Sequence, residues 1–287
     1  TAGSDMNNQP LPVIYISTKR TIYLGRSYHL PLREVNSGAT WLLTCLEGCI
    51  KFRVSSSNQW VTAKSLLISA GTKISIDNKD AIISVCYLDP SQADYQAIKI
   101  NMRSVNNGVY YNYQYENQLI SDLTMLRDTA PTFDEAQVQM ENIIYAHVDK
   151  RQDKFQVDPR IQHVIYRLKK TAELNIPVKD FAKEVAISES GLIKLFRKNV
   201  GTPIRKHRLW YRLLNFITYK VAGKSTAEAI SLTGFSDISH LSKCYSSLFG
   251  IPFSVAFAQP ATMRCIVSDT ELKKASMTRT LPQAMVS

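Results

Sequence analysis

Two stretches of the sequence set basic and polar side chains at helical spacing, a pattern that suits a helix in contact with a nucleic acid. The first stretch carries along one predicted helix face Ser190, Ile193, Lys194, Arg197 and Lys198. A helix fits the major groove of a duplex, where its N-terminal half reaches base edges and its later residues reach phosphates. The candidate base-reading residues are therefore Ser190, Ile193 and Lys194 and, in the second stretch, Ile238, Ser239, His240, Ser242 and Lys243.

The positive charge of the chain is concentrated in its C-terminal part. Residues 1–154 hold 15 Lys and Arg against 15 Asp and Glu, whereas residues 155–287 hold 20 against 9, so the net charge of +11 lies entirely in the second part. Such an excess attracts a polyanion through counterion release. Charge alone does not separate a nucleic acid from an anionic membrane or from a merely solubilising surface. The residues expected to contact phosphates are Arg197, Lys198, Thr202, Arg205, Lys206 and Arg212.

The candidate residues lie in a region whose apolar pattern is almost wholly helical. Ser188 and Ser225 can cap helix N-termini, and Gly201 and Gly250 can end helices. The pattern predicts helices at 160–174, 178–185, 189–199, 202–221, 225–232 and 236–248. Two short helices joined by a tight turn occur twice in this series, which predicts two helix-turn-helix units.

The N-terminal half begins with short β-rich runs separated by turn-forming residues. These runs predict strands at 13–16, 21–24, 41–46, 50–54, 60–63, 66–69, 73–76 and 82–88. Regular short strands of this kind indicate a β-sandwich or a small barrel. Two helices follow, and the first carries Leu119, Leu123 and Leu126 at i, i+4 and i+7. This apolar stripe could pack on the β-domain or on a second copy of the chain, so the three leucines are dimerisation candidates.

The sequence contains no recognisable arrangement of catalytic or metal-binding residues. The five histidines are scattered, the strand region has no His-x-His with a following Glu, and there is no Gly-rich phosphate loop. The five cysteines form no CxxC pair, and we expect reduced thiols, with Cys45 and Cys49 as buried small apolar side chains. No stretch approaches the ~18 apolar residues of a membrane span. We therefore expect a cytoplasmic protein without membrane contact, metal or cofactor; an enzyme is the rival class.

The order and separation of the C-terminal motifs resemble those of the AraC/XylS family of transcription regulators. The resemblance covers about residues 158–257 and rests on the stretches 181–188, 192–198, 201–202, 212–213, 234–237 and 249–252. It implies an all-α double helix-turn-helix domain at 159–260, whose two recognition helices enter successive major grooves of double-stranded DNA. The upstream part, 7–148, is similar to the family's cupin-like effector and dimerisation domain, an all-β barrel with trailing α-helices. We expect a linker at 149–158 and a flexible tail at 261–287.

The resemblance also implies partners, and departures from it bear on how sequence is read. A homodimer, a contact with RNA polymerase as made by an activator, and a small-molecule effector inside the β-domain are the implied partners. The family usually has Ile-Ala and Tyr-Phe where this chain has Ala229-Ile230 and His240-Leu241, and it commonly has Ser-Pro where this chain has Pro252-Phe253. Ile193 and Ile238 cannot bond to base edges but can contact a thymine methyl group. The alternative is a ligand-sensing or protein-interaction module without sequence-specific DNA binding.

Overall fold

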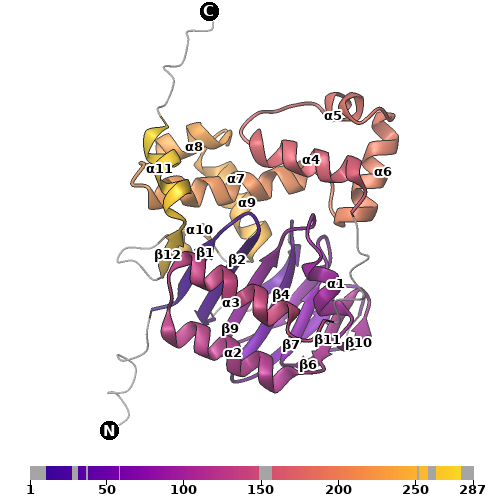
Figure 1. Cartoon of the computed structure of the whole chain (residues 1–287), viewed down its shortest axis with the longest axis vertical. Coiled ribbons are helices and arrows are strands. Elements are labelled where there is room, and N and C mark those ends of the chain that lie inside the picture. Colours follow the sequence, from indigo (N-terminus) through magenta and orange to yellow (C-terminus); the bar gives the residue numbers. More distant parts are fainter. Residues whose placement is uncertain are drawn as a thin grey trace, which may run out of the picture.

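The computed structural model consists of a β-rich N-terminal domain and a helical C-terminal domain stacked on it (Figure 1). It describes residues 11–27, 32–36, 38–57, 59–148, 157–250, 252–257 and 263–278. Of the predicted linker at 149–158, only Val157 and Asp158 lie within the described residues. Asp158 caps the first helix of the C-terminal domain, because its side chain accepts a hydrogen bond from the Arg160 amide.

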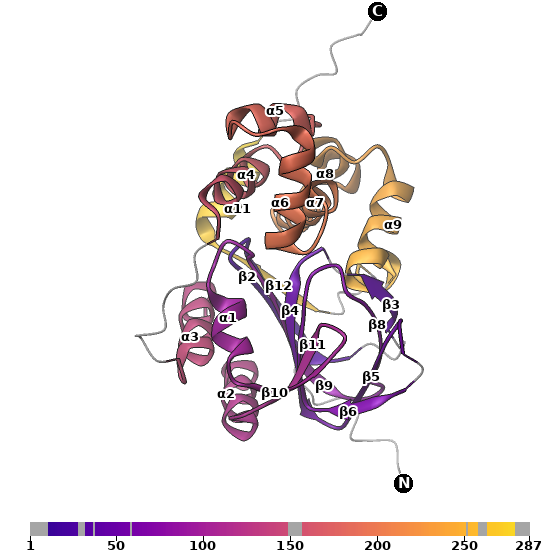
Figure 2. The same cartoon turned by 90° about the vertical axis from the view of Figure 1, so that its right-hand side faces the viewer.

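Two β-sheets face each other in the N-terminal domain (Figure 2). The larger sheet runs in the order β10 (Met102–Asn106), β11 (Val109–Tyr113), β7 (Ser65–Ile68), β4 (Thr40–Glu47), β9 (Ile82–Leu88), β2 (Arg20–Arg26), β1 (Val13–Ile16) and β12 (Arg264–Val267). The smaller sheet runs β3 (Leu32–Asn36), β8 (Lys73–Asp77), β5 (Ile50–Val54) and β6 (Val61–Ala63). All eight predicted strands form, and β3, β10, β11 and β12 are additional to the prediction. The predicted all-β domain is confirmed.

The outer face of the larger sheet is covered by three helices. They are α1 (Asp94–Lys99), α2 (Glu116–Thr129) and α3 (Phe133–Tyr145). Leu119, Leu123 and Leu126 of α2 are at most 5% exposed and pack in the core between this sheet and the helices. The prediction that they form a dimer contact is therefore wrong, because their apolar stripe is already covered by the chain's own β-domain. Cys45 is buried as predicted, whereas Cys49 is exposed.

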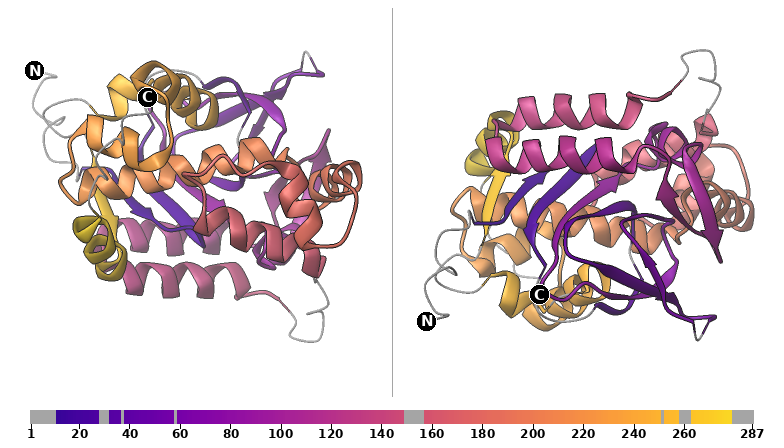
Figure 3. Two further views of the ribbon diagram at one scale, coloured as in Figure 1. Left: turned by 90° about the horizontal axis from the view of Figure 1, so that it is seen from above. Right: turned by 90° about the horizontal axis from the view of Figure 1, so that it is seen from below.

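The C-terminal domain contains the predicted series of helices. The helices are α4 (Pro159–Lys170), α5 (Val178–Glu184), α6 (Glu189–Val200), α7 (Ile204–Val221), α8 (Thr226–Thr233), α9 (Ile238–Phe249) and α10 (Phe253–Ala256). The long helix α7 runs between the α5–α6 pair and the α8–α9 pair, as the view from above shows (Figure 3). The predicted all-α double helix-turn-helix domain is confirmed.

The segment after α10 does not form the flexible tail that we predicted. Residues 264–267 form β12, which adds a parallel edge strand to β1 of the N-terminal domain in the register Val13 to Arg264. Helix α11 (Asp269–Met277) follows, capped by the Ser268 side chain, and buries Ala275. Apolar residues of β12 complete the sheet edge and α11 packs on α7, so the prediction is wrong for 264–277. Residues 279–287 lie outside the described residues.

A cluster of aromatic rings joins the two domains. The Tyr87 ring of β9 lies 4.8 Å from the Trp210 ring of α7 and 5.6 Å from the Phe249 ring of α9, measured between centroids. On its other side Tyr87 stacks on Trp41 of β4 at 5.9 Å. The core between the two sheets is consequently continuous with the core of the helical domain. The sequence predicts a core for each half, but the structure merges the inter-sheet core with that of the helices.

Backbone contacts bring the domains closer than side chains would permit. Gly71 and Gly201 both have a positive φ, and a Cβ on Gly71 would lie 2.6 Å from the Gly201 carbonyl oxygen. Beside them, the Gly38 carbonyl accepts hydrogen bonds from the Thr202 hydroxyl at 3.4 Å and from His207 Nδ1 at 3.3 Å. Burial lowers the pKa of His207 to about 4, so the ring is neutral at pH 7 and one nitrogen is free to accept from Tyr211.

Removing β12 and α11 tests whether the tail holds the domains together. Ending the chain after residue 262 exposes the β1 edge and the part of α7 that α11 covers. We expect Tm to fall by on the order of 5–10 °C, since each kcal/mol lost from the free energy of unfolding lowers Tm by roughly 2–4 °C in a protein of this size. A chain ending at Thr278 keeps both elements and serves as the control. Differential scanning calorimetry measures the shift, and equal Tm values for the two truncated chains would contradict the structural role of the tail.

Candidate nucleic-acid interface

The first helix-turn-helix unit consists of α5 and α6. Phe181 and Ala182 of α5 and Leu192 and Phe196 of α6 are buried against each other and α7. Ala182 is small, which lets the two helices approach. The Ser188 hydroxyl caps α6 by accepting a hydrogen bond from the Gly191 amide at 3.1 Å, as the sequence predicts. The packed side of α6 thus fixes which side chains face solvent.

The solvent side of α6 carries the predicted contact residues. Ser190 and Lys194 are exposed, and Ile193 is 46% exposed, which is uncommon for an isoleucine within a packed helix pair. Arg197 and Lys198 are exposed in the last turns of α6. The basic side chains therefore follow the three base-reading candidates along one accessible surface.

The second helix-turn-helix unit, α8 and α9, repeats the arrangement. Ser225 and Glu228 form a capping box at the start of α8, and Gly234 ends α8 with a φ of 73°. Asp237 caps α9, with its carboxylate accepting a hydrogen bond from the His240 amide at 2.8 Å. Leu241 is fully buried and orients the helix on its core. Ser236, expected inside the helix, precedes the cap.

The candidate residues of α9 are not equally accessible. Ser239 and Lys243 are exposed and Ile238 is 47% exposed, whereas Ser242 and His240 are half-buried. The His240 ring packs edge-on against Phe235, and its Nδ1 lies 3.2 Å from the Ser236 hydroxyl. These contacts hold the His240 ring against the turn before α9. We therefore rank it below the other α9 residues as a candidate for reading bases.

Two of the predicted phosphate ligands are buried and have structural roles. Thr202 is fully buried, and its hydroxyl donates to the Gly38 carbonyl in the interdomain contact. Arg212 is 4% exposed, and its guanidinium donates to the carbonyl oxygens of Ala172 and Gly234 at 2.6 Å each and to the Asn175 side chain at 2.9 Å. The prediction is wrong for both residues, because Thr202 is buried against the β-domain in the segment before α7, and Arg212 lies on a buried face of α7.

The other basic residues at the start of α7 differ in their surroundings. Arg205 is exposed, whereas Lys206 is half-buried at the domain boundary. Burial, together with the nearby Lys73 of the β-domain, lowers the pKa of Lys206 to about 8. Sequence reasoning missed Arg208, which lies one turn after Arg205, between the two helix-turn-helix units. The spacing 205, 208, 212 is visible in the sequence, but only the fold shows what this face of α7 meets.

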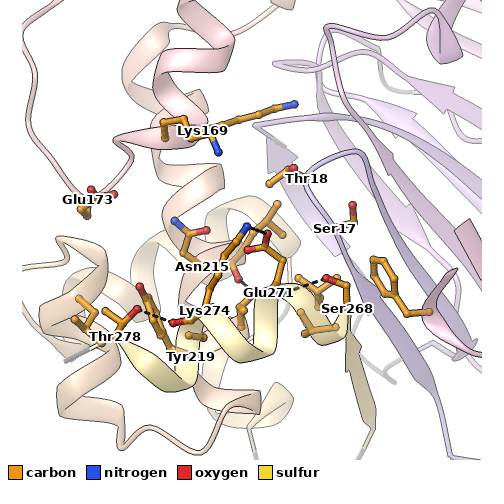
Figure 4. Close-up of a pocket in the computed structure, with 18 of the residues that line it drawn as sticks. Ser17, Thr18, Lys169, Glu173, Asn215, Tyr219, Ser268, Glu271, Lys274 and Thr278 are labelled. Carbon is orange, nitrogen blue, oxygen red and sulfur yellow. Dashed lines mark hydrogen bonds and ion pairs between the residues drawn. The ribbon is translucent and has the colours of Figure 1, made fainter. Parts of the chain in front are cut away.

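The described residues contain no group of three or more His, Cys, Asp or Glu side chains placed to hold a metal ion. Within the same residues no helix is both long and apolar enough to cross a membrane. A large polar groove of about 920 Å³ lies between the β1–β2 turn, α4, α7 and α11 (Figure 4). Two of its three lysines form ion pairs, Lys274 with Glu271 at 3.0 Å and Lys169 with the buried Asp89. The third, Lys170, has its ammonium 5.9 Å from the centre of the Tyr166 ring.

A known protein family matches the C-terminal domain of this chain. Residues 181–259 match the family model described as a helix-turn-helix domain. The HTH-type transcriptional regulator GbdR of Pseudomonas aeruginosa, from strains UCBPP-PA14 and PAO1, is 29% identical over 122 residues, which are 39% of this chain and 33% of that protein. The chain thus spans about a third of the length of these curated relatives.

Solved structures resemble the whole fold. An apo lysine-to-alanine variant of ToxT from Vibrio cholerae strain SCE256 has a TM-score of 0.58 at 13% identity, covering 84% of this chain and 97% of that one. Wild-type ToxT of that strain, bound to an unsaturated fatty acid, has a TM-score of 0.54 at 13% identity, covering 83% and 94%. At this identity the likeness concerns the fold: a β-domain followed by a double helix-turn-helix domain.

Alanine variants can separate base contacts from phosphate contacts. We expect Lys194→Ala and Lys243→Ala to weaken binding to a duplex selected from a random pool by roughly 5- to 150-fold, because a base contact contributes about 1–3 kcal/mol. Their affinity for random duplex should change much less. Arg197→Ala should lower affinity for both duplexes alike and reduce the log–log salt slope by about 0.9, as loss of one phosphate contact does. Fluorescence anisotropy with the full chain measures both, and equal losses on both duplexes for all three variants would refute this division.

Proposed function

We propose, from the premise that the C-terminal domain of this chain belongs to the AraC-type helix-turn-helix family, that the protein is a DNA-binding transcription regulator. One observation carries the proposal. The apolar side of α6 and of α9 packs inside a helix-turn-helix unit, and the opposite side of each helix exposes polar and basic side chains to solvent. Lys194 and Lys243 occupy comparable places on the two helices, six residues after the caps Ser188 and Asp237.

The proposed mechanism places one helix in each of two successive major grooves. Successive grooves on one face of DNA are ~10 base pairs apart, so a single chain would read an asymmetric site. Exposed Arg197, Lys198 and Arg205 would contact phosphates and supply the salt-sensitive part of the affinity. Ile193 and Ile238 would contact thymine methyl groups, which makes part of the readout apolar. Acting on DNA, the protein would work in the cytoplasm; a homodimer and a contact with RNA polymerase belong to the same proposal.

Salt-dependent binding tests the proposal directly. We expect the full chain to bind a random duplex of ~24 base pairs with an affinity that falls steeply between 50 and 300 mM salt, because each neutralised phosphate adds about 0.9 to the log–log slope. Vesicles of phosphatidylglycerol are the control for a general attraction to anionic surfaces. An absence of duplex binding at low salt, or equal binding to vesicles, would favour a protein-interaction or ligand-sensing module instead.

We propose as a second function that a small apolar ligand modulates the regulator. A small cavity of about 80 Å³ lies where the β-domain meets α9, with walls formed by Trp41, Tyr87 and Phe249 among others. This volume is well below the roughly 300 Å³ of typical ligand sites, so a ligand would have to displace a wall such as Met263 or Phe249. Displacing Phe249 would move the C-terminal end of α9, which gives the cavity a direct route to the DNA-binding surface.

The polar groups of this cavity decide which ligand chemistry fits. Among the described residues, no lysine or arginine lines it, and the buried Asn78 contributes a side-chain oxygen that has no hydrogen-bond partner there. An unpaired buried acceptor favours a ligand that donates a hydrogen bond. An apolar alcohol or phenol therefore fits these residues better than a carboxylate such as the fatty acid bound to ToxT.

A thermal-shift screen with matched ligands tests this assignment. We expect a long-chain alcohol or an alkylphenol to raise Tm by a few degrees, because a ligand at a hundred times its Kd stabilises by about 2.7 kcal/mol. The carboxylic acid of equal chain length should give a smaller shift, and Asn78→Ala should remove the preference for the alcohol. A larger shift with the acid, or none with any compound, would count against the proposed ligand.

A further inference from the structure

The two helix-turn-helix units are separated by a cleft of about 570 Å³, which we call the α7 cleft. Its floor is the face of α7 that carries Arg205, Arg208 and Arg212. The opposite face of α7, with His207 and Trp210, packs on the β-domain. One wall is the segment 175–178, which leads into α5, and the other is the turn 234–236 together with the first turn of α9. The cleft therefore opens away from the β-domain and borders the N-terminal end of α9.

The charge of the α7 cleft is strongly positive. Three guanidinium groups line it, and none of the described residues along it is an aspartate or a glutamate. Asp237 directly follows the cleft residue Ser236 in the sequence. Its carboxylate is exposed and accepts a hydrogen bond from the His240 amide as the cap of α9. Burial lowers the pKa of Arg208. Burial and the charge of Arg208 lower the pKa of Arg212, and the nearby Glu173 carboxylate offsets only part of this effect, so positive charge prevails in the cleft.

The hydrogen-bonding capacity of the cleft is only partly used. The Arg212 guanidinium donates hydrogen bonds to backbone carbonyls and to the Asn175 side chain. Arg208 donates through Nη2 to the Ile176 carbonyl, but its buried Nε has no partner among the described residues. No hydrogen bond or ion pair is formed by the Arg205 side chain within those residues. A buried donor without an acceptor is costly, and an anion that accepts from it would recover that free energy.

We propose that the α7 cleft binds a phosphate of the DNA backbone, at the strand segment that crosses between the two major grooves. This inference rests on the proposed function: with α6 in one groove and α9 in the next, the connecting helix α7 faces the backbone between them. Arg205 closes on the phosphate from the exposed rim and Arg208 reaches it through the unused guanidinium edge. Arg212 adds positive charge from the floor while it holds both walls in place.

This contact has a role that the recognition helices do not supply. Phosphate contacts fix the register of a protein on a duplex without reading its sequence. A phosphate held at the midpoint between α6 and α9 sets the position of both helices at once. The α7 cleft thus acts as the alignment point of the interface, and losing it lowers affinity for every sequence to the same extent.

The test uses the full chain and the variant Arg205→Gln, since this exposed side chain makes no bond that the fold needs. Lys273→Gln is the matched control, because it removes one exposed positive charge from α11. We expect Arg205→Gln to lower affinity for a random duplex of ~24 base pairs about 5- to 10-fold at 100 mM salt, and to reduce the log–log salt slope by about 0.9. The ratio of affinities for selected and random duplex should not change, and Lys273→Gln should stay within about twofold of the unmodified chain.

The outcomes separate the cleft from the function on which it rests. If the unmodified chain binds no duplex, both proposals fall. If it binds with a steep slope and Arg205→Gln behaves like Lys273→Gln, the α7 cleft alone is overturned. A free phosphate is the other source of the same chemistry: a Tm increase with millimolar inorganic phosphate that Arg205→Gln abolishes, combined with an unchanged salt slope on DNA, would assign the cleft to a phosphorylated small molecule and reject the backbone contact.

Discussion

The contact of Tyr87 with Trp210 and Phe249 is the interaction on which the arrangement of this molecule depends. It places a ring from the middle of the large β-sheet against the two helices α7 and α9, so the apolar interior between the sheets continues into the helical domain. Apolar area buried in this way contributes roughly 25 cal/mol per Å² and is lost only if the domains separate. The aromatic cluster, with the Gly38 hydrogen bonds beside it, therefore determines where the helix-turn-helix domain lies.

The β-domain contacts α6 and α9 at the same end of each helix. The C-terminal ends of α6 and α9 both face the β-domain, with α9 next to β3 (Figure 2). Phe249 of α9 contacts Tyr87, and Gly201, which ends α6, lies against the Ala70–Gly71 backbone. The N-terminal halves, which carry the candidate base-reading side chains, point away from the β-domain. The β-domain thus holds α6 and α9 without covering Lys194 or Lys243, and a change in the cavity beside Phe249 would be felt by α9 before α6.

The sequence predicts most of this fold because local signals and tertiary packing agree. The predicted caps Ser188 and Ser225 and the predicted helix ends Gly201 and Gly250 have these roles in the structure, and the predicted β-rich runs all form strands. Among the unpredicted strands, the two at the edges of the larger sheet share a cause. In β10, residues alternate between half-buried and exposed, and in β12 only Val267 is buried, so neither carries the apolar alternation of a core strand. Such strands form because a neighbouring edge offers backbone hydrogen bonds, which no local pattern encodes.

The errors at individual sites have the same origin. Arg212 and Thr202 have the residue types of phosphate ligands, and Leu119, Leu123 and Leu126 have the spacing of a dimer seam. Residue type gives the chemistry that a side chain can do, whereas burial decides whether a partner can reach it. The backbone carbonyls that surround Arg212 and the sheet that covers the α2 leucines come from segments distant in the sequence. The exposed candidates on α6 and α9 stay predictions of contact, supported by their accessibility.

The rigidity of this arrangement has a consequence for the DNA. Helices α6 and α9 both pack on the single helix α7, and both contact the β-domain at one end, so in the proposed complex their spacing is set by the protein unless a ligand displaces one of these contacts. Grooves on straight DNA recur at a set spacing, and a mismatch with two rigidly held helices must be accommodated by the duplex. Smooth bending of 20–30 base pairs by 40–90° costs on the order of 1–6 kcal/mol and depends on the flexibility of the sequence bent. Sequence preference would then arise in part between the two grooves, opposite the α7 cleft, at base pairs that no side chain reads.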